Sequence, residues 1–149
     1  MSLSEQITTD MKAAMKSGEK LKLETLRSLR AHFIELSKRG GDRPVGPDDE
    51  LSVLTTAIKR RREAIELYRQ GGREELARQE ELELEIIQSY LPKQLTPEEI
   101  ETGIDRIVRE TGSSSPKDFG KVMGMAMKEF KGKSDGAMIQ QLVRKKLGG

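Results

Sequence analysis

The chain has 149 residues, of which 34 % are hydrophobic, 35 % are charged and only 3 % are aromatic. This composition favours thin helical packing, in which each helix buries one apolar stripe. It disfavours β-sandwiches and barrels, which need many β-branched and aromatic residues. The lack of cysteine excludes disulfides, thiol nucleophiles and cysteine-ligated metals, and the single histidine, His32, excludes a histidine metal cage within one chain. We therefore expect no metal site, no cofactor and no catalytic residue.

The formal net charge of +2 is unevenly distributed. Residues 1–93 carry 17 basic and 17 acidic side chains, whereas residues 111–149 carry eight basic and three acidic ones. Clustered positive charge attracts polyanions and raises their encounter rate. The carboxyl-terminal end is therefore the region to search for a polyanion site.

Apolar residues recur at helical spacing in segments separated by glycine and proline. In chain order, the predicted helices span residues 3–17, 20–39, 48–70, 73–90, 97–110, 116–130 and 135–147, with a loop at 40–47. Pro92 interrupts the pattern, and Thr96 followed by Pro97 is a new helix start. The sequence therefore predicts an all-α protein with an N-terminal domain of about four helices (1–92) and a smaller three-helix C-terminal domain (96–149).

The sequence also bears on the location of the protein. No apolar stretch approaches the roughly 20 residues of a membrane-spanning helix. The first residues lack the basic start and apolar run of a secretory signal. We expect a cytoplasmic protein that does not enter the membrane.

Residues 59–62, a lysine followed by three arginines, form the densest run of positive charge. Four successive side chains point around most of a helix, so they do not form one nucleic-acid-binding face. If the glycines at 71–72 fold the next helix back, glutamates face this run, and further pairs at i,i+4 are available. The glutamates are Glu80, Glu81, Glu83 and Glu85, and the helical pairs are Lys59–Glu63 and Arg62–Glu66. We favour this pairing over a nucleic-acid patch.

Three other features have ordinary structural explanations. The serines at 113–115, close to Lys117, resemble a Ser–Lys nucleophile pair, but a loop before a helix start favours helix capping instead. The acids at 48–50 suggest a magnesium site, yet acids are common in the first turn of a helix. His32 has no recognisable nucleophile to pair with, so we give it no role.

The predicted helix 116–130 has an apolar face and an opposite face of lysines and glycines. On a regular helix the second face holds Lys117, Gly120, Lys121, Gly124, Lys128 and Lys131. Each interior glycine costs a helix about 1 kcal/mol relative to alanine, so two on one face need a reason. Either phosphates approach a shallow, lysine-lined floor, or a neighbouring helix packs against the glycines and the lysines are merely solvated. The residues alone leave these alternatives almost even.

The chain resembles the YqeY-like proteins of the GatB/YqeY family from end to end, and five stretches carry the resemblance. They are MKAAMK (11–16), TLR (25–27), YLPKQL (90–95), KDFGKVMG (117–124) and KGKSDG (131–136). The resemblance implies an all-helical protein whose C-terminal domain is shared with the tail of the B subunit of the glutamine-dependent tRNA amidotransferase, where the tail helps to hold tRNA. Ser134 stands where alanine is usual, a mild departure. Carried over to this chain, the nucleic-acid-binding positions are Lys117, Gly120, Lys121, Gly124, Lys131, Gly132, Lys133 and Gly136, to which the helix pattern adds Lys128.

Three functional hypotheses follow. The first is a tRNA-binding accessory protein related to the amidotransferase, without catalytic machinery of its own. The second is a helical adaptor that binds an amidotransferase or an aminoacyl-tRNA synthetase through the glycine face. The third is a carbon–nitrogen ligase with glutamine as amido-N-donor, an activity that the resemblance implies only through the larger enzyme.

Overall fold

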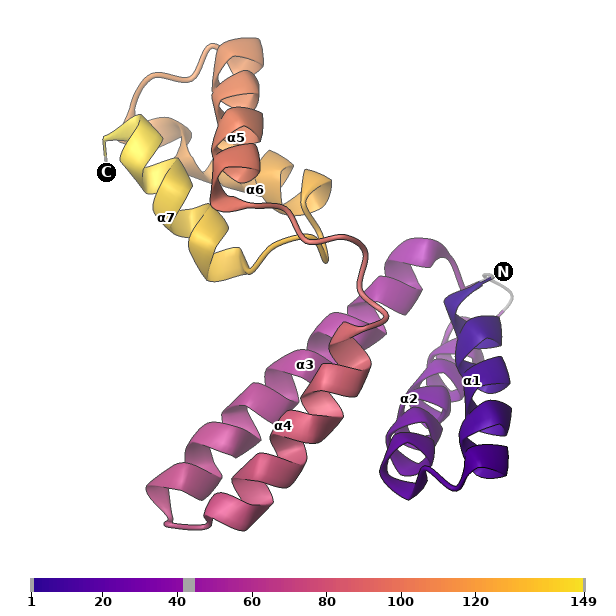
Figure 1. The fold of residues 1–149 in the computed structure, drawn as a ribbon. Helices are drawn as coiled ribbons and strands as arrows, with labels where there is room; N and C mark the ends of the chain where they lie inside the picture. Colours follow the sequence, from indigo (N-terminus) through magenta and orange to yellow (C-terminus); the bar gives the residue numbers. More distant parts are fainter. Residues whose placement is uncertain (1, 42–44, 149) are drawn as a thin grey trace. The chain divides into compact units, whose positions relative to one another are not determined.

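The computed structural model describes residues 2–41 and 45–148. Within these ranges the chain forms seven α-helices and one short 3-10 turn and contains no β-strand, so the predicted all-α class is confirmed (Figure 1). The chain divides into two compact units, Met1–Leu91 (unit 1) and Pro92–Gly149 (unit 2).

Unit 1 contains four helices: α1 (Leu3–Ser17), α2 (Lys20–Arg39), α3 (Pro47–Gln70) and α4 (Glu74–Gln88). The first two have the predicted bounds. Helix α3 begins one residue earlier than predicted, because the fixed φ of Pro47 suits the first helical turn. Helix α4 is shorter than the predicted 73–90. Of the predicted loop 40–47, residues 42–44 lie outside the described residues.

The ends of α1 follow from local hydrogen bonding. The Ser2 hydroxyl accepts the Glu5 N–H at 3.2 Å, and the Glu5 carboxylate accepts the Ser2 N–H at 3.1 Å, which forms a capping box. At the other end, Gly18 has φ +77°, a left-handed conformation that glycine adopts without a steric penalty. These two signals fix the length of the helix.

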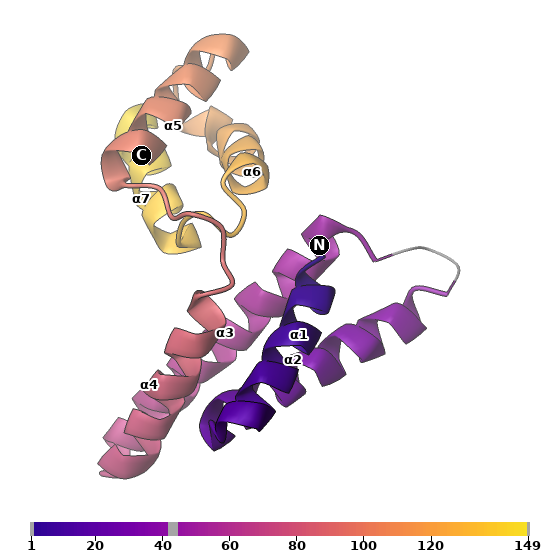
Figure 2. The ribbon, with the colours of Figure 1, turned by 45° about the vertical axis from the view of Figure 1, so that its right-hand side comes forward.

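An apolar core holds unit 1 together, and hydrogen bonds attach α1 to the rest of the unit. The buried core residues are Ile7, Leu26, Leu29, Phe33, Leu54, Ala57, Ile58 and Ile87. The Tyr90 hydroxyl donates to Asp10 Oδ2 at 2.5 Å, and burial together with this hydrogen bond raises the pKa of Tyr90. The buried Glu50 accepts the Ser4 N–H at 2.8 Å. Helices α3 and α4 lie side by side as an antiparallel hairpin (Figure 2).

Unit 2 contains α5 (Pro97–Thr111), a 3-10 turn (Pro116–Asp118), α6 (Phe119–Glu129) and α7 (Gly136–Leu147). The predicted single helix 116–130 is therefore wrong at its start. The Asp118 carboxylate accepts the N–H groups of Ser114 and Ser115, at 3.0 and 3.4 Å, and this bonding tightens the first turn. Lys117 consequently lies on the 3-10 turn and not on α6.

The core of unit 2 depends on a glycine that sequence analysis did not single out. Its buried residues are Ile100, Ile104, Ile107, Val122, Ala126, Phe130, Ile139, Val143 and Leu147. A Cβ atom added to Gly103 would lie 2.3 Å from Cζ of Phe130, which is far inside van der Waals contact. Only glycine at this position of α5 leaves room for the phenyl ring.

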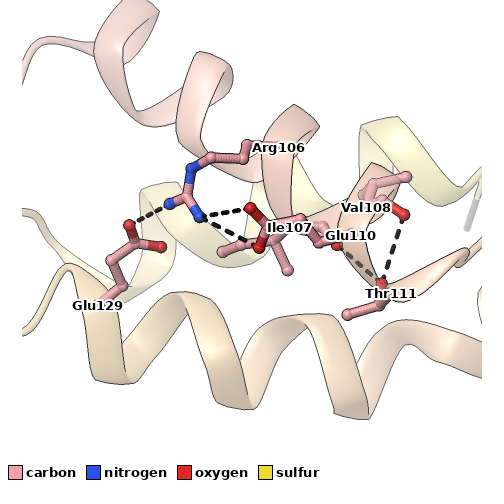
Figure 3. A network of polar contacts seen from close by, with 6 residues as sticks. All are labelled: Arg106, Ile107, Val108, Glu110, Thr111 and Glu129. Carbon is pink, nitrogen blue, oxygen red and sulfur yellow. Dashed lines mark hydrogen bonds and ion pairs between the residues drawn. The ribbon is translucent and has the colours of Figure 1, made fainter.

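Ion pairs connect α5 to both of its neighbours. Arg106 of α5 pairs with Glu129 at the end of α6 and also lies 3.4 Å from Glu110 on its own helix (Figure 3). On the other side, Lys146 of α7 lies 3.0 Å from both Glu101 and Asp105. These contacts reinforce the apolar packing at its solvent-exposed edge.

Residues 92–95 are attached to unit 2 by hydrogen bonds. Gln94 Nε2 donates to the Gly132 carbonyl at 2.7 Å. The Leu95 N–H donates to the Lys133 carbonyl at 2.9 Å. The segment that precedes α5 is therefore held by the turn between α6 and α7.

Candidate nucleic-acid interface

The exposed face of α6 carries four of the predicted site residues: Gly120, Lys121, Gly124 and Lys128. A Cβ atom added to Gly120 or to Gly124 meets no described neighbour within 4 Å. No helix of the described part of unit 2 therefore packs against these glycines. The result is a strip of bare backbone beside two lysines that is accessible from outside the unit.

The other predicted lysines lie at the two ends of this face. Lys117 is on the 3-10 turn before α6, and Lys131 and Lys133 follow α6 in the turn after Phe130. The predicted stripe along one regular helix is therefore wrong in its geometry, because α6 is only 11 residues long. Lys121 and Lys128, seven positions apart, are the two lysines that share the helix itself.

Each acidic side chain of residues 111–149 already has a partner elsewhere. Glu129 pairs with Arg106 of α5. Asp118 accepts backbone N–H groups before the 3-10 turn, and Asp135 caps α7 by accepting the Ala137 N–H at 3.1 Å. Among the residues that the structure describes, Lys117, Lys121 and Lys128 form no ion pair. The positive charge along α6 is thus left without a carboxylate partner.

Lys131 and Lys133 differ in their surroundings. Lys131 is half-buried and has an interaction partner, so it is less available to a ligand. Lys133 is exposed, and its backbone carbonyl holds the Leu95 N–H.

Two predicted site glycines serve the turn between α6 and α7. Gly132 has φ +74°, which glycine adopts readily, and its carbonyl accepts a hydrogen bond from Gln94. Gly136 is the first residue of α7, where an added Cβ would lie 3.4 Å from the Met127 methyl group. Gly132 therefore shapes the turn that carries Lys131 and Lys133, and Gly136 lies against Met127 where α7 begins.

Of the three basic residues of α7, two already have interaction partners within unit 2 and are less available to a ligand. Lys146 is engaged by α5, and hydrogen bonds to Glu101 and to Asp105 raise the pKa of its ammonium group. Arg144 lies over the Phe119 ring, 5.5 Å from its centroid, in a cation–π contact. Lys145 is exposed.

The serines before α6 have structural partners. The Ser113 side chain is buried and lies 2.7 Å from the Thr111 hydroxyl. Ser115 is the residue that precedes the 3-10 turn, and its N–H donates to Asp118. At this turn it is the Asp118 carboxylate that accepts the N–H groups of Ser114 and Ser115. In the described ranges, no group of three His, Asp or Glu side chains could hold a metal ion.

The run at 59–62 is neutralised only in part. Arg61 lies 3.6 Å from Glu83 of α4, as predicted. Burial raises the pKa of Glu83 and so does the neighbouring Glu80, whereas Arg61 lowers it. Glu81 pairs with Arg69 instead.

The other predicted pairs of this run do not form. Within residues 2–41 and 45–148, the structure contains neither a Lys59–Glu63 nor an Arg62–Glu66 pair, so those expectations are wrong. All four side chains are exposed on the helix surface. Water competes with such pairs and reduces their free energy.

A profile of YqeY-like proteins matches residues 4–147, almost the whole chain. The chain belongs to the YqeY-like family. The sequence resemblance to that family is thereby confirmed, while the link to the amidotransferase tail remains an inference from sequence. None of the described helices combines the length and the apolar composition of a membrane span.

Curated relatives of this YqeY-like protein come from fungi. It is 32 % identical over 146 residues to "Altered inheritance of mitochondria protein 41, mitochondrial" of Pyrenophora tritici-repentis, which covers 95 % of this chain and 77 % of the relative. The protein of the same name from Eremothecium gossypii is 28 % identical over 120 residues, 76 % of this chain and 66 % of the relative. The match to the Vanderwaltozyma polyspora protein of that name covers 56 % of its length. These names place the relatives in mitochondria, so a cytoplasmic location for this chain stays a prediction.

Proposed function

We propose that this YqeY-like protein is an RNA-binding accessory protein, and that the α6 face of unit 2 contacts the phosphate backbone of tRNA. The observation that carries the proposal is the combination of open glycines and unpaired lysines. Gly120 and Gly124 leave the α6 backbone accessible, and Lys117, Lys121 and Lys128 have no carboxylate partner in the described chain. Ammonium groups beside an accessible backbone are suited to phosphate oxygens.

The shape of the surface favours contacts with the phosphate backbone over recognition of bases. Phe130 is buried, and Phe119 is half-buried beneath Arg144, so the described part of unit 2 has no exposed aromatic side chain on which a base could stack. Binding would then depend on the fold of the RNA and on salt. The tail of the amidotransferase B subunit, which unit 2 resembles in sequence, helps to hold tRNA in that enzyme, and this supports tRNA as the RNA class.

Titration of tRNA binding against salt tests the proposal. Each phosphate contact contributes about 0.7–0.9 to the slope of log K against log salt. The double variant Lys121→Gln/Lys128→Gln should therefore reduce that slope by about 1.4–1.8. The matched control is Lys12→Gln/Lys16→Gln, which removes two exposed lysines of α1 and the same total charge.

The control variant should retain the wild-type slope. Equal slopes for the two double variants would mean that binding depends on net charge alone, and the α6 assignment would then be wrong. Absence of tRNA binding by the wild-type chain at low salt would refute the proposed function as a whole.

One observation favours a protein-binding adaptor as the second candidate. Met125 and Met127 of α6 are 41 % and 43 % exposed, close to the open glycines. A helix of an amidotransferase or synthetase could pack against such a surface, and Gly120→Leu would then abolish partner capture without changing RNA titrations. Pull-down from lysate with and without RNase separates the candidates, because RNA-dependent capture disappears after RNase treatment.

A further inference from the structure

A cleft of about 440 Å³ lies between α2 and α3 in unit 1. Its volume falls within the range of about 300–1,000 Å³ that is usual for small-molecule sites. The apolar lining consists of Leu36, Val53 and Ala57. The charged or polar lining residues that matter for a ligand are His32, Glu35, Arg39, Asp49, Thr56 and Arg60.

The two carboxylates of the cleft already have partners. Glu35 Oε1 lies 2.5 Å from Arg39 NH2, four residues along the same helix. Asp49 Oδ2 accepts the Gly46 N–H at 3.0 Å at the start of α3. A cationic ligand would therefore have to displace an existing partner from an acid of this cleft.

Two hydrogen-bond donors of the cleft, Thr56 and Arg60, have no partner among the described residues. Thr56 and Arg60 are four positions apart, so they share one face of α3, and neither forms a hydrogen bond or ion pair with the described residues. From α2, His32 lines the cleft with its Nδ1 4.0 Å from Glu35 Oε2, which is beyond hydrogen-bond distance. Guanidinium and hydroxyl groups can both donate to anionic oxygens.

We propose that this cleft binds a small organic anion. The anionic oxygens of the ligand, from a carboxylate or a phosphate ester, contact Arg60 and Thr56. The apolar body of the ligand packs against Leu36, Val53 and Ala57. This site gives Arg60, which makes no ion pair with α4, a function distinct from that of Arg61 in the same run.

The test uses the full chain with benzoate and phenyl phosphate as probes, followed by backbone amide shifts in NMR spectra. Both anions should produce saturable shifts centred on Thr56 and Arg60, and the tighter one identifies the anionic group that the site prefers. Arg60→Gln should weaken binding by about ten-fold or more, because a charge-assisted hydrogen bond is lost. Thr56→Val should weaken it by a smaller factor.

The matched control is Arg62→Gln, an exposed arginine of the same run that does not line the cleft. It should bind both probes as the wild type does. Benzylamine and benzyl alcohol should produce no saturable shifts at these residues. The proposal is overturned if Arg60→Gln binds as tightly as Arg62→Gln, or if benzylamine binds as well as benzoate. This readout is independent of tRNA binding, so either proposal can fail while the other stands.

Discussion

Unit 2 uses the same residue types in two opposite ways. Around α5, the Phe130 ring occupies the space beside Gly103, and Lys146 lies between the carboxylates of Glu101 and Asp105. On the outer face of α6, Gly120 and Gly124 meet no neighbour, and the lysines beside them have no carboxylate partner. Glycine therefore permits close packing on one helix and leaves the backbone accessible on the other.

This difference distinguishes glycines that the packing of the helices requires from glycines that it does not require. A helix-interior glycine that a buried ring contacts has its reason within the fold. A helix-interior glycine with open space around it costs about 1 kcal/mol without any packing gain in return. Gly124 is such a residue, whereas Gly120 lies in the first turn of α6, and the comparison between Gly103 and Gly124 can be tested by identical substitutions on the two helices.

The largest expected effect comes from Gly103→Leu compared with Gly124→Leu. The first forces a side chain into the space of Phe130, and because overpacking commonly costs about 1–3 kcal/mol and sometimes more, we expect a loss near 3 kcal/mol. The second enters open space and replaces a poor helix former, so stability should rise by about 0.5–1 kcal/mol. Hydrogen exchange of unit 2 amides in the full chain measures both changes.

A second substitution tests why Gly103→Leu is expected to lower the stability of unit 2. Combining it with Phe130→Ala should cost less than the sum of the two single changes, because the alanine leaves room for the added side chain. Simple additivity would show that the phenyl ring is not the obstacle. A Gly124→Leu variant that is as unstable as Gly103→Leu would remove the contrast between the two helices.

A smaller effect is expected on ligand binding. Gly124→Leu places a branched side chain on the proposed RNA-binding face, so it should weaken tRNA binding by roughly three- to ten-fold through loss of close approach. Gly124→Ala, which adds only one methyl group, should have little effect. The ratio of the two affinities, measured at one salt concentration, checks this expectation. Unchanged binding in the leucine variant would place the RNA elsewhere.

Much of the fold could be predicted from sequence because its signals are local. The capping box at Ser2, the glycine after α1 and the Thr96–Pro97 start each involve neighbouring residues, and these helix ends were predicted within one residue. The 3-10 turn was missed although its signal, Asp118 three residues after Ser115, is present in the chain. Whether this turn is 3-10 or α-helical depends on one side chain, the Asp118 carboxylate, which accepts the backbone N–H groups before it.

The site was harder to predict because its properties depend on contacts between helices. Gly103 occupies the apolar face of α5, between Ile100 and Ile104, and a glycine at such a position indicates close approach of another side chain. Which lysines are paired depends on where α5 and α7 meet, so the engagement of Lys146 could not be read from spacing. The sequence predicts the candidate lysines and glycines, and three-dimensional packing decides which of them remain accessible.

The smallest predicted effect separates the paired lysine from an unpaired one. Hydrogen bonds to Glu101 and Asp105 raise the pKa of Lys146 above 10.5. A raised lysine pKa in the folded state means that the contribution to stability is complete below about 10.5 and is lost as the pH rises through the raised value. Lys146→Gln should therefore slightly lower the stability of unit 2 at pH 7, and this deficit should shrink at alkaline pH, whereas Lys121→Gln should change stability at neither pH. Urea unfolding of both variants and the wild type across this pH range measures the difference in the free energy of unfolding. If the Lys146→Gln difference persists unchanged above the raised pKa, Lys146 acts through its aliphatic stem and not through its charge.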